Sequence, residues 1–421
     1  MLSKWRLLLK ELFEKLWFVA VLYAALALAT NAAAIAIGPL LPKGLGTSLG
    51  AESVEAVLTI LASSMLSVVT FSLGIMVSAF AGAAGAVTPR ATALLKTDRT
   101  TQRVLATFLG SFLYSLIGII ALNAGALTEN DRLVLFFVTI IVVAIVVIAI
   151  LRWIAHLTVF GQMTDSISKV EQAARRALSD RIEAPYLGGH GHSGPPPSEA
   201  HPITQSKIGY VRYVHMDWLQ DYADDQGCQI YLAALPGSFV HAGATLAYVL
   251  GDQPEDPTRI TRAFTIGTTR SFDQDPRFGL AVLAEIAERA LSPAINDPGT
   301  AIDILGRAVR LLAELADPRD PELLFPRIWV PALTLDDMME DIFPPIARDG
   351  VGLYSVQIRL QKSLRALAQI APKRFGQLAL THSEHALTRC RPNLLTHEIA
   401  AIEAVCDQIA EAAQTPRNRQ I

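Results

Sequence analysis

Charged residues are scarce in this sequence of 421 residues. Asp, Glu, Lys and Arg make up 18% of it, against about 25% in an ordinary soluble domain. The shortage indicates membrane segments, and it is uneven. Residues 1–152 carry a net charge of +4 (11 basic, 7 acidic), whereas the remainder carries −7 (25 basic, 32 acidic). The acidic remainder argues against a nucleic-acid-binding protein, which needs a clustered basic face.

Cysteine is rare as well. The three cysteines are Cys228, Cys390 and Cys406. An odd number without a close pair excludes a disulfide-stapled scaffold and suits a reducing compartment. His382, His385 and His397 lie near Cys390, but their spacing matches no strong zinc pattern. We therefore predict no metal site and no cofactor.

Four long runs contain no charged residue at all. They cover about residues 16–37, 56–88, 104–127 and 133–151. Each is long enough to cross a hydrocarbon core of about 30 Å, so four transmembrane helices in a lipid bilayer are predicted. Histidine is missing from the runs too, which weakens the case for a proton relay, an ion-coupled carrier or an intramembrane enzyme.

Basic residues lie on one side of these predicted spans. They flank the first span (Lys4, Arg6, Lys10 and Lys15) and follow the second (Arg90, Lys96, Arg99 and Arg103), whereas the other two loops hold only Lys43 and Arg132. Short cytoplasmic loops are enriched in Lys and Arg. A multi-pass protein of the bacterial inner membrane with both termini in the cytoplasm is therefore expected.

Small and hydroxyl-bearing residues recur at helical spacing in the second span. They are Ser63, Ser67, Thr70, Gly74, Ser78 and Gly85. On a helix, steps of three and four residues place them on one face. Such a face allows close packing of helices. The alternative is that it lines a pore in a homo-oligomer, where neutral hydroxyls face water.

Beyond the spans, composition divides the chain into four parts. Residues 153–183 continue the helical pattern as a cytoplasmic extension, and residues 184–203 form a linker rich in Gly, Pro and His. Residues 204–270 contain short strand patterns, and residues 271–421 are mainly helical. The predicted class is a membrane protein with a four-helix transmembrane region followed by an α+β cytoplasmic domain, comprising a small β-rich subdomain and a helical bundle.

Polar residues concentrate in one segment of the mainly helical part. Asp275-Pro276 and Asp297-Pro298 each predict a helix start, because Asp caps free N–H groups and Pro is tolerated at the first position. Capping alone explains these residues. The alternative is a pocket for a small ion or ligand, with Arg270, Asp273, Asp275, Arg277, Asn296, Asp297, Thr300 and Asp303 converging at the two helix starts.

Several short motifs carry a family resemblance. They are Thr88-Pro89-Arg90, Asp98, Thr101-Gln102, Gly209-Tyr210-Val211, Pro236-Gly237, Gln274-Asp275-Pro276, Phe278-Gly279-Leu280 and the run from Ala290 to Ala301. With them the chain resembles, over nearly its whole length, the bacterial predicted membrane proteins of domain of unknown function 2254. The resemblance implies a four-span N-terminal region and a cytoplasmic C-terminal domain. It implies no activity and no catalytic residue.

Two functions fit these features. The first is an oligomeric channel lined by the second span and gated by the cytoplasmic domain. The second is a membrane-anchored ligand-binding sensor or scaffold without transport. An enzyme is not expected, because no Gly-rich phosphate loop, nucleophile elbow or recognisable nucleophile–base pair is found in the sequence.

Overall fold

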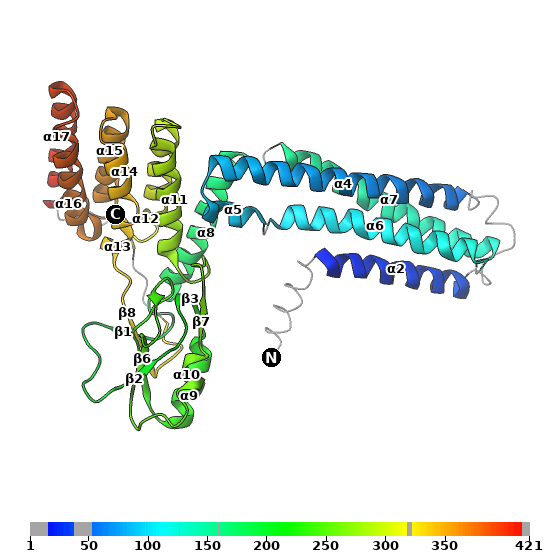
Figure 1. Ribbon diagram of the computed structural model, residues 1–421, viewed down its shortest axis with the longest axis horizontal. Coiled ribbons are helices and arrows are strands. Elements are labelled where there is room, and N and C mark those ends of the chain that lie inside the picture. The colour runs from blue at the N-terminus through cyan, green and yellow to red at the C-terminus, as the bar shows by residue number, and fades with distance from the viewer. Residues whose placement is uncertain are drawn as a thin grey trace, which may run out of the picture. The chain divides into compact units, whose positions relative to one another are not determined.

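The computed structural model describes residues 16–37, 53–96, 98–125, 127–158, 160–317 and 322–414. The basic residues predicted to flank the first span, and Lys43, lie outside these ranges. The chain divides into two compact units, Met1–Ser166 and Ile167–Ile421. We call them the membrane unit and the C-terminal unit (Figure 1).

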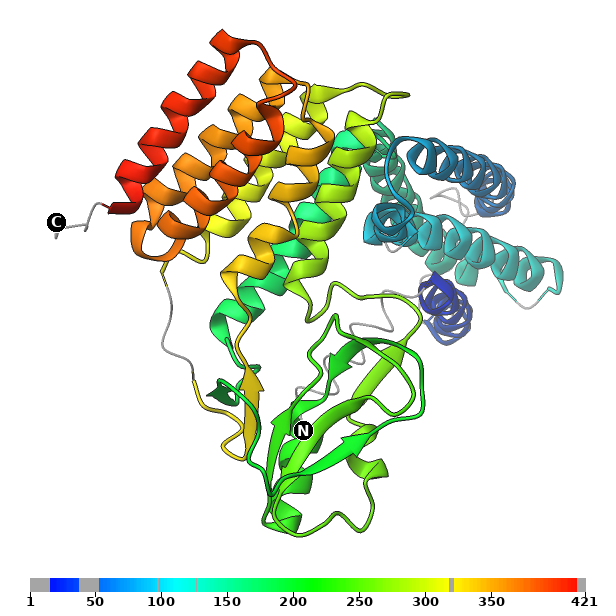
Figure 2. The same ribbon diagram turned by 60° about the vertical axis from the view of Figure 1, so that its left-hand side comes forward.

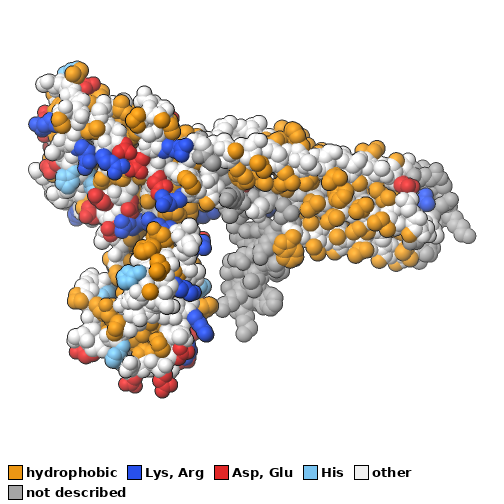
Figure 3. Space-filling view, viewed as in Figure 1, with side chains coloured by type: hydrophobic (Ala, Val, Ile, Leu, Met, Phe, Trp, Pro, Cys, Tyr) orange, Lys and Arg blue, Asp and Glu red, His pale blue; other side chains and the backbone are white. Residues whose placement is uncertain are grey.

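Four helices of the membrane unit are long and apolar enough to cross a bilayer. They are α2 (Leu16–Ile37), α4 (Val54–Ala86), α6 (Arg99–Asn123) and α7 (Glu129–Leu157). A short helix, α5 (Pro89–Lys96), follows α4. Hydrophobic side chains cover most of the visible outer face of this unit (Figure 3). The prediction of a membrane protein with a four-helix apolar region is therefore confirmed.

Helix α6 is the centre of the membrane unit. It packs against α2, α4 and α7, and 50% of its span is buried, against 17% for α4. Gly110 lets α2 approach, because a Cβ at this position would lie 2.5 Å from the Tyr23 ring. The buried Tyr114 hydroxyl lies 3.2 Å from Thr139 Oγ1. Since Thr139 itself donates to the Leu135 carbonyl, Tyr114 is the donor in that pair.

The helical extension predicted over residues 153–183 is interrupted. Helix α7 ends at Leu157, and α8 (Met163–Glu183) is a separate helix. Gly161 lies between them with a φ of +79°, a left-handed conformation that ends a helix. A Cβ there would lie 2.9 Å from the Ala79 side chain. The boundary between the units therefore falls after Ser166, later than the predicted end of the membrane region at residue 152.

Two small sheets lie in the C-terminal unit. The first has the strand order β1 (His190–His192), β8 (Ile328–Pro331), β4 (Gln229–Leu232), β6 (Thr245–Leu250), β2 (His201–Thr204). In it, β8 runs parallel to both its neighbours, and the remaining pairs are antiparallel. The second is antiparallel, with the order β5 (Phe239–Val240), β3 (Gly209–Val214), β7 (Phe264–Gly267).

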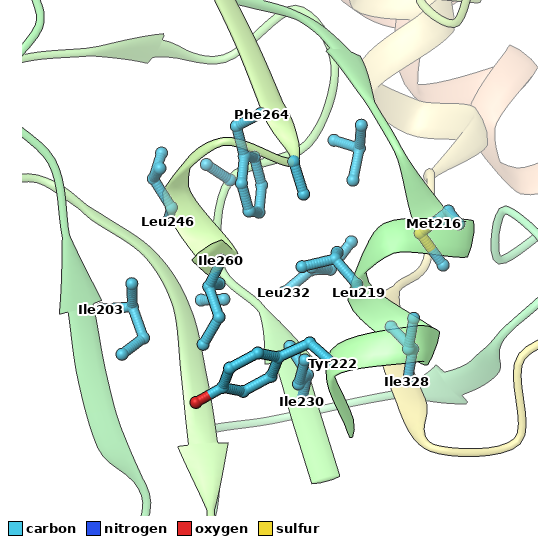
Figure 4. Packing of buried hydrophobic residues seen from close by; sticks show 14 of the residues in the cluster. Ile203, Met216, Leu219, Tyr222, Ile230, Leu232, Leu246, Ile260, Phe264 and Ile328 are labelled. Atoms are coloured by element: carbon cyan, nitrogen blue, oxygen red, sulfur yellow. The ribbon is translucent and has the colours of Figure 1, made fainter. Parts of the chain in front are cut away.

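Helices α9 (Met216–Gln226) and α10 (Thr258–Thr261) complete this subdomain. Their apolar faces and the sheets enclose one hydrophobic core. Leu219 from α9, Ile260 from α10 and Ile230 from β4 meet in it (Figure 4). The core fixes the sheets as one body, from which the polar loops project.

The predicted flexible linker over residues 184–203 is wrong in part, because this segment supplies β1 and β2 to the first sheet. The His190 ring stacks on Trp329 at 4.8 Å. Glycine here serves close packing: a Cβ at Gly189 would lie 2.6 Å from the Ile328 carbonyl oxygen, and one at Gly191 would lie 2.6 Å from the Tyr186 ring.

The rest of the C-terminal unit is helical. After α8 it contains α11 (Pro276–Leu291), α12 (Pro298–Ala313), α13 (Leu335–Glu340), α14 (Phe343–Asp349), α15 (Tyr354–Ile370), α16 (Pro372–Cys390) and α17 (Thr396–Gln414). The last three pack on one another side by side (Figure 2). Gly279 brings α11 against α8, because a Cβ there would collide with Ala174. The combination of small sheets and a helical bundle confirms the predicted α+β class.

Candidate functional site

The small-residue stripe of α4 faces away from the other described helices of the membrane unit. The predicted residues Ser63, Ser67, Thr70, Gly74, Ser78 and Gly85 are all exposed on the membrane unit. The opposite face of α4, with Leu58, Leu61 and Met65, is buried in the unit's core. Packing among the described helices of the membrane unit therefore does not explain the stripe.

Three hydroxyls of the stripe are satisfied by their own helix. Ser63 donates to the Thr59 carbonyl at 2.9 Å, Ser67 to the Ser63 carbonyl at 3.1 Å and Thr70 to the Leu66 carbonyl at 3.0 Å. A hydroxyl has one hydrogen to donate and two lone pairs that accept. The exposed face of α4 is therefore rich in acceptors, and the hydroxyls of Ser63, Ser67 and Thr70 need no further partner in order to lie in a membrane.

Bulky apolar residues border the stripe. With 3.6 residues per turn, Leu66, Leu73 and Val77 fall on one side of it, and Ile60 and Phe71 fall on the other. All five are exposed, Phe71 by 70%. A narrow band of small polar residues thus runs between two apolar margins along a helix of 33 residues.

The beginning of α6 is tied to the end of α7. Asp98 caps α6 by accepting from the Thr101 backbone N–H at 2.9 Å. His156 Nε2 lies 3.2 Å from Asp98 Oδ1 and 3.2 Å from Thr101 Oγ1. Asp98 and Thr101 belong to the motifs found in the sequence, whereas His156 does not. The available signal was a histidine that closely follows the fourth charge-free run.

Arg270 and Asp275 satisfy each other in the C-terminal unit. The guanidinium donates to both carboxylate oxygens, at 2.8 and 3.0 Å, and Asp275 also caps α11 by accepting from the Phe278 N–H. Burial raises the pKa of Asp275, and the hydrogen bond and charge of Arg270 oppose that rise. Gly237 leaves room for this carboxylate, because a Cβ there would collide with it.

The neighbours of this pair are also engaged. The Gln274 side chain accepts from the Val214 N–H at 2.8 Å and donates to the Val214 carbonyl at 3.3 Å, so it holds β3 to the start of α11. Arg277 donates to both oxygens of Asp341. Asp273 accepts a hydrogen bond from the Ser271 hydroxyl. Most of the polar groups before α11 therefore hold the fold together.

The polar residues at the second helix start form a separate group. Asp297 caps α12 by accepting from the Thr300 N–H and hydroxyl, at 3.1 and 2.6 Å, and the hydroxyl bond lowers the pKa of Asp297. Asp303 pairs with Arg307 at 2.7 Å. Asn296 is exposed, with a φ of +50°.

The eight residues proposed from the sequence do not converge. The Asp297 N–H donates to the Ala290 carbonyl, so α12 starts where α11 ends. Helix α11 has 16 residues, which corresponds to about 24 Å. Arg270 and Asp275 therefore lie roughly one helix length from Asn296 and Asp297, and a single pocket containing both groups is excluded.

An ion network fixes α8 to α12. Glu171 accepts from Arg307 at 2.6 Å and from Arg310 at 2.9 Å. Burial alone would raise the pKa of Glu171, but the hydrogen bonds and charges of Arg310 and Arg307 outweigh it and lower the pKa. Within the ranges that the structure describes, no group of His, Cys, Asp and Glu is arranged to hold a metal ion.

Comparisons with known proteins identify relatives of this chain and its family. An uncharacterized protein of Mycobacterium tuberculosis (strain CDC 1551) and one of Mycobacterium bovis are each 28% identical over 342 residues, which are 75% of this chain. The chain spans 64% of the length of these relatives. No solved structure matches it. The model of the family described as "Predicted membrane protein (DUF2254)" matches residues 14–366, and the chain belongs to that family.

Proposed function

We propose that the protein is an oligomeric channel of the inner membrane, lined by the α4 stripe and gated by the C-terminal unit. The observation that carries the proposal is the orientation of the stripe, opposite the face with which α4 packs into its own unit. Around a symmetry axis, the same faces of several copies would meet. Small residues and hydroxyl acceptors would then surround a water-filled path.

The margins of the stripe supply the contacts that such an oligomer needs. Phe71 on one side and Leu66 and Leu73 on the other are exposed and bulky. In a ring of α4 helices, each margin would pack against the adjacent copy while the stripe stays at the axis. The charge-free spans favour passage of a solute over ion-coupled transport or catalysis.

We also propose that both termini lie in the cytoplasm, because Lys and Arg are enriched in short cytoplasmic segments. Arg90, Lys96 and Arg103 follow α4 or begin α6, so they mark the cytoplasmic end of the lining helix. The chain then passes from α7 through a short break into α8, the first helix of the C-terminal unit. Movement of α8 could reach the membrane helices through this connection.

Ion flux into liposomes that contain the purified full-length protein tests the proposal. Thr70→Leu adds bulk to the stripe and should reduce the flux to less than about half. Ala144→Leu is the matched control, because Ala144 is exposed on α7 and should leave the flux unchanged. Equal effects of the two variants would contradict a path along the stripe.

The alternative is a membrane-anchored sensor or scaffold without transport. The pocket first proposed for it is not formed, but Arg181 lines two cavities in the C-terminal unit, and these favour a ligand-binding role there. Absence of flux under voltage, membrane tension and osmotic challenge would favour this alternative over the channel.

A further inference from the structure

A buried arginine is left partly unsatisfied in the C-terminal unit. Arg181 lies in the last turn of α8 and is 6% exposed. Its Nη2 donates to the Gln274 carbonyl at 3.2 Å. Its Nη1 is buried and has no hydrogen-bond partner among the described residues. An unsatisfied buried donor destabilises the fold unless something else supplies an acceptor.

This guanidinium is a cation at neutral pH. Burial lowers the pKa of Arg181 to about 10, and the charge of Asp275 partly opposes that shift. Asp275 is already paired with Arg270 through both oxygens. A buried positive charge with a free N–H and no carboxylate of its own is the kind of group that recognises an anion.

Two cavities share Arg181 as a wall residue, and their charges differ. The first, of about 460 Å³, is also lined by three carboxylates, those of Asp180, Asp217 and Asp273. They would repel an anion. The second, of about 310 Å³, is lined by Arg181 and Arg374 against one carboxylate, Asp317. Two cations less one anion give this second cavity a net charge of +1.

Arg374 strengthens the preference of the second cavity for an anion. It lies in the first turn of α16 and is half-buried. Within the described part of the chain, its guanidinium has no ion-pair partner. The two arginines come from helices that are far apart in the sequence, so the fold brings together two guanidinium groups that no nearby acid neutralises fully.

The remainder of the second cavity is mostly apolar. Its wall includes Ile182 from α8, Leu315 after α12, and Leu333, Leu335 and Met338 around the start of α13. Apolar walls with a few charged groups are typical of small-molecule sites, whose volumes are about 300–1,000 Å³. The volume of this cavity is at the lower end of that range, which limits the length of a bound molecule.

We infer that this cavity binds a medium-chain monocarboxylate, with the carboxylate on Arg181 and Arg374 and the alkyl chain against the apolar wall. A planar carboxylate matches the fork of guanidinium donors. One negative charge balances the net +1 of the wall. Burial of the alkyl chain of the ligand supplies affinity that a bare anion lacks. The inference does not depend on whether α4 lines a pore.

Equilibrium dialysis of radiolabelled octanoate against the full-length protein in nanodiscs tests the inference. Empty nanodiscs measure partition into lipid, which is subtracted. We expect one saturable equivalent per chain. Arg374→Gln should weaken binding at least about tenfold, as loss of a charged hydrogen bond does. Lys373→Gln is the matched control, because Lys373 is exposed on the same helix, and it should leave the affinity unchanged.

Competition separates the carboxylate from its chain. Decanoate should displace octanoate, whereas octanol and acetate should not. Displacement by octanol would show that the carboxylate is not recognised. Displacement by acetate at equal concentration would show that the alkyl chain contributes nothing to binding. Either result overturns the inference, as does equal binding by Arg374→Gln and Lys373→Gln. Leu333→Trp places a larger side chain in the apolar part of the cavity. It should abolish binding without removing a charge.

Discussion

The stripe of α4 and the polar segment before α11 were both predicted from the sequence as candidate sites. In the structure they differ in exposure and in how their polar groups are paired. The stripe is exposed, and its hydroxyls donate only to their own helix. The polar segment is folded inward, and Arg270 and Asp275 are paired with each other. A polar motif is available for function only if its groups remain unsatisfied or face outward.

Removing Asp275 should have the largest effect. Asp275→Ala leaves Arg270 without its partner and removes the cap of α11, so the free energy of unfolding should fall by about 3 kcal/mol. Denaturant unfolding followed by tryptophan fluorescence measures it. Asp297→Ala removes a half-buried cap with no arginine partner among the described residues and should cost only about 1 kcal/mol. Equal losses would mean that the Arg270–Asp275 pair stabilises the fold no more than a helix cap alone does.

Loss of the Glu171 ion network should have the next largest effect on the free energy of unfolding, and this effect should depend on pH. The pKa of Glu171 is lowered in the folded state, so its stabilising effect is present above the unfolded pKa of about 4.3. It is lost as the pH falls through the folded value. At pH 7 the free energy of unfolding of the wild type should exceed that of Glu171→Gln by about 2 kcal/mol, and this difference should shrink as the pH falls below about 4.3. A difference that persists in acid would contradict the ion network.

A smaller effect is expected inside the membrane unit. Tyr114→Phe removes the hydrogen bond to Thr139 without changing the shape of the buried ring. Such bonds between membrane helices contribute about 0.6 kcal/mol on average, which unfolding in mixed micelles can measure. A loss above about 2 kcal/mol would exceed the range measured for them and would show that the hydroxyl has a further buried partner.

A substitution in the stripe of α4 should have the smallest effect on stability. Ser67→Ala removes an exposed hydroxyl that bonds only to its own helix, so the unfolding energy should change by less than about 0.5 kcal/mol. The same micelle assay measures it. A large destabilisation would show that Ser67 holds a structural contact, and the contrast between the stripe and the polar segment would then disappear.

The sequence predicted the membrane helices because absence of charge is a local property. Each charge-free run corresponds to one long helix, and Pro89 marks the end of the second run. The stripe was also predictable, because spacing on a single helix fixes which residues share a face. The outward orientation of the stripe could not be predicted, because it depends on which face of α4 is covered by α6.

Features that depend on contacts between distant parts of the chain could not be predicted from the sequence. Glycine in residues 184–203 resembled a flexible linker, but Gly189 and Gly191 are there because Ile328 and Tyr186 leave no room for a Cβ. The pairing of Gln274 with Val214 joins residues 60 positions apart. The second cavity combines Arg181 with Arg374. None of these contacts leaves a periodic trace in the sequence.

The position of β8 has a consequence for synthesis of the protein. This strand lies between β1 and β4, yet it is synthesised after the other strands of its sheet. At about 5–20 residues per second, roughly 5–20 s separate the emergence of β4 from that of β8. During this interval the membrane helices can already enter the bilayer, while the edges of β1 and β4 lack their partner and are open to pairing with other chains. Nascent chains that stop before Ile328 would keep those edges open.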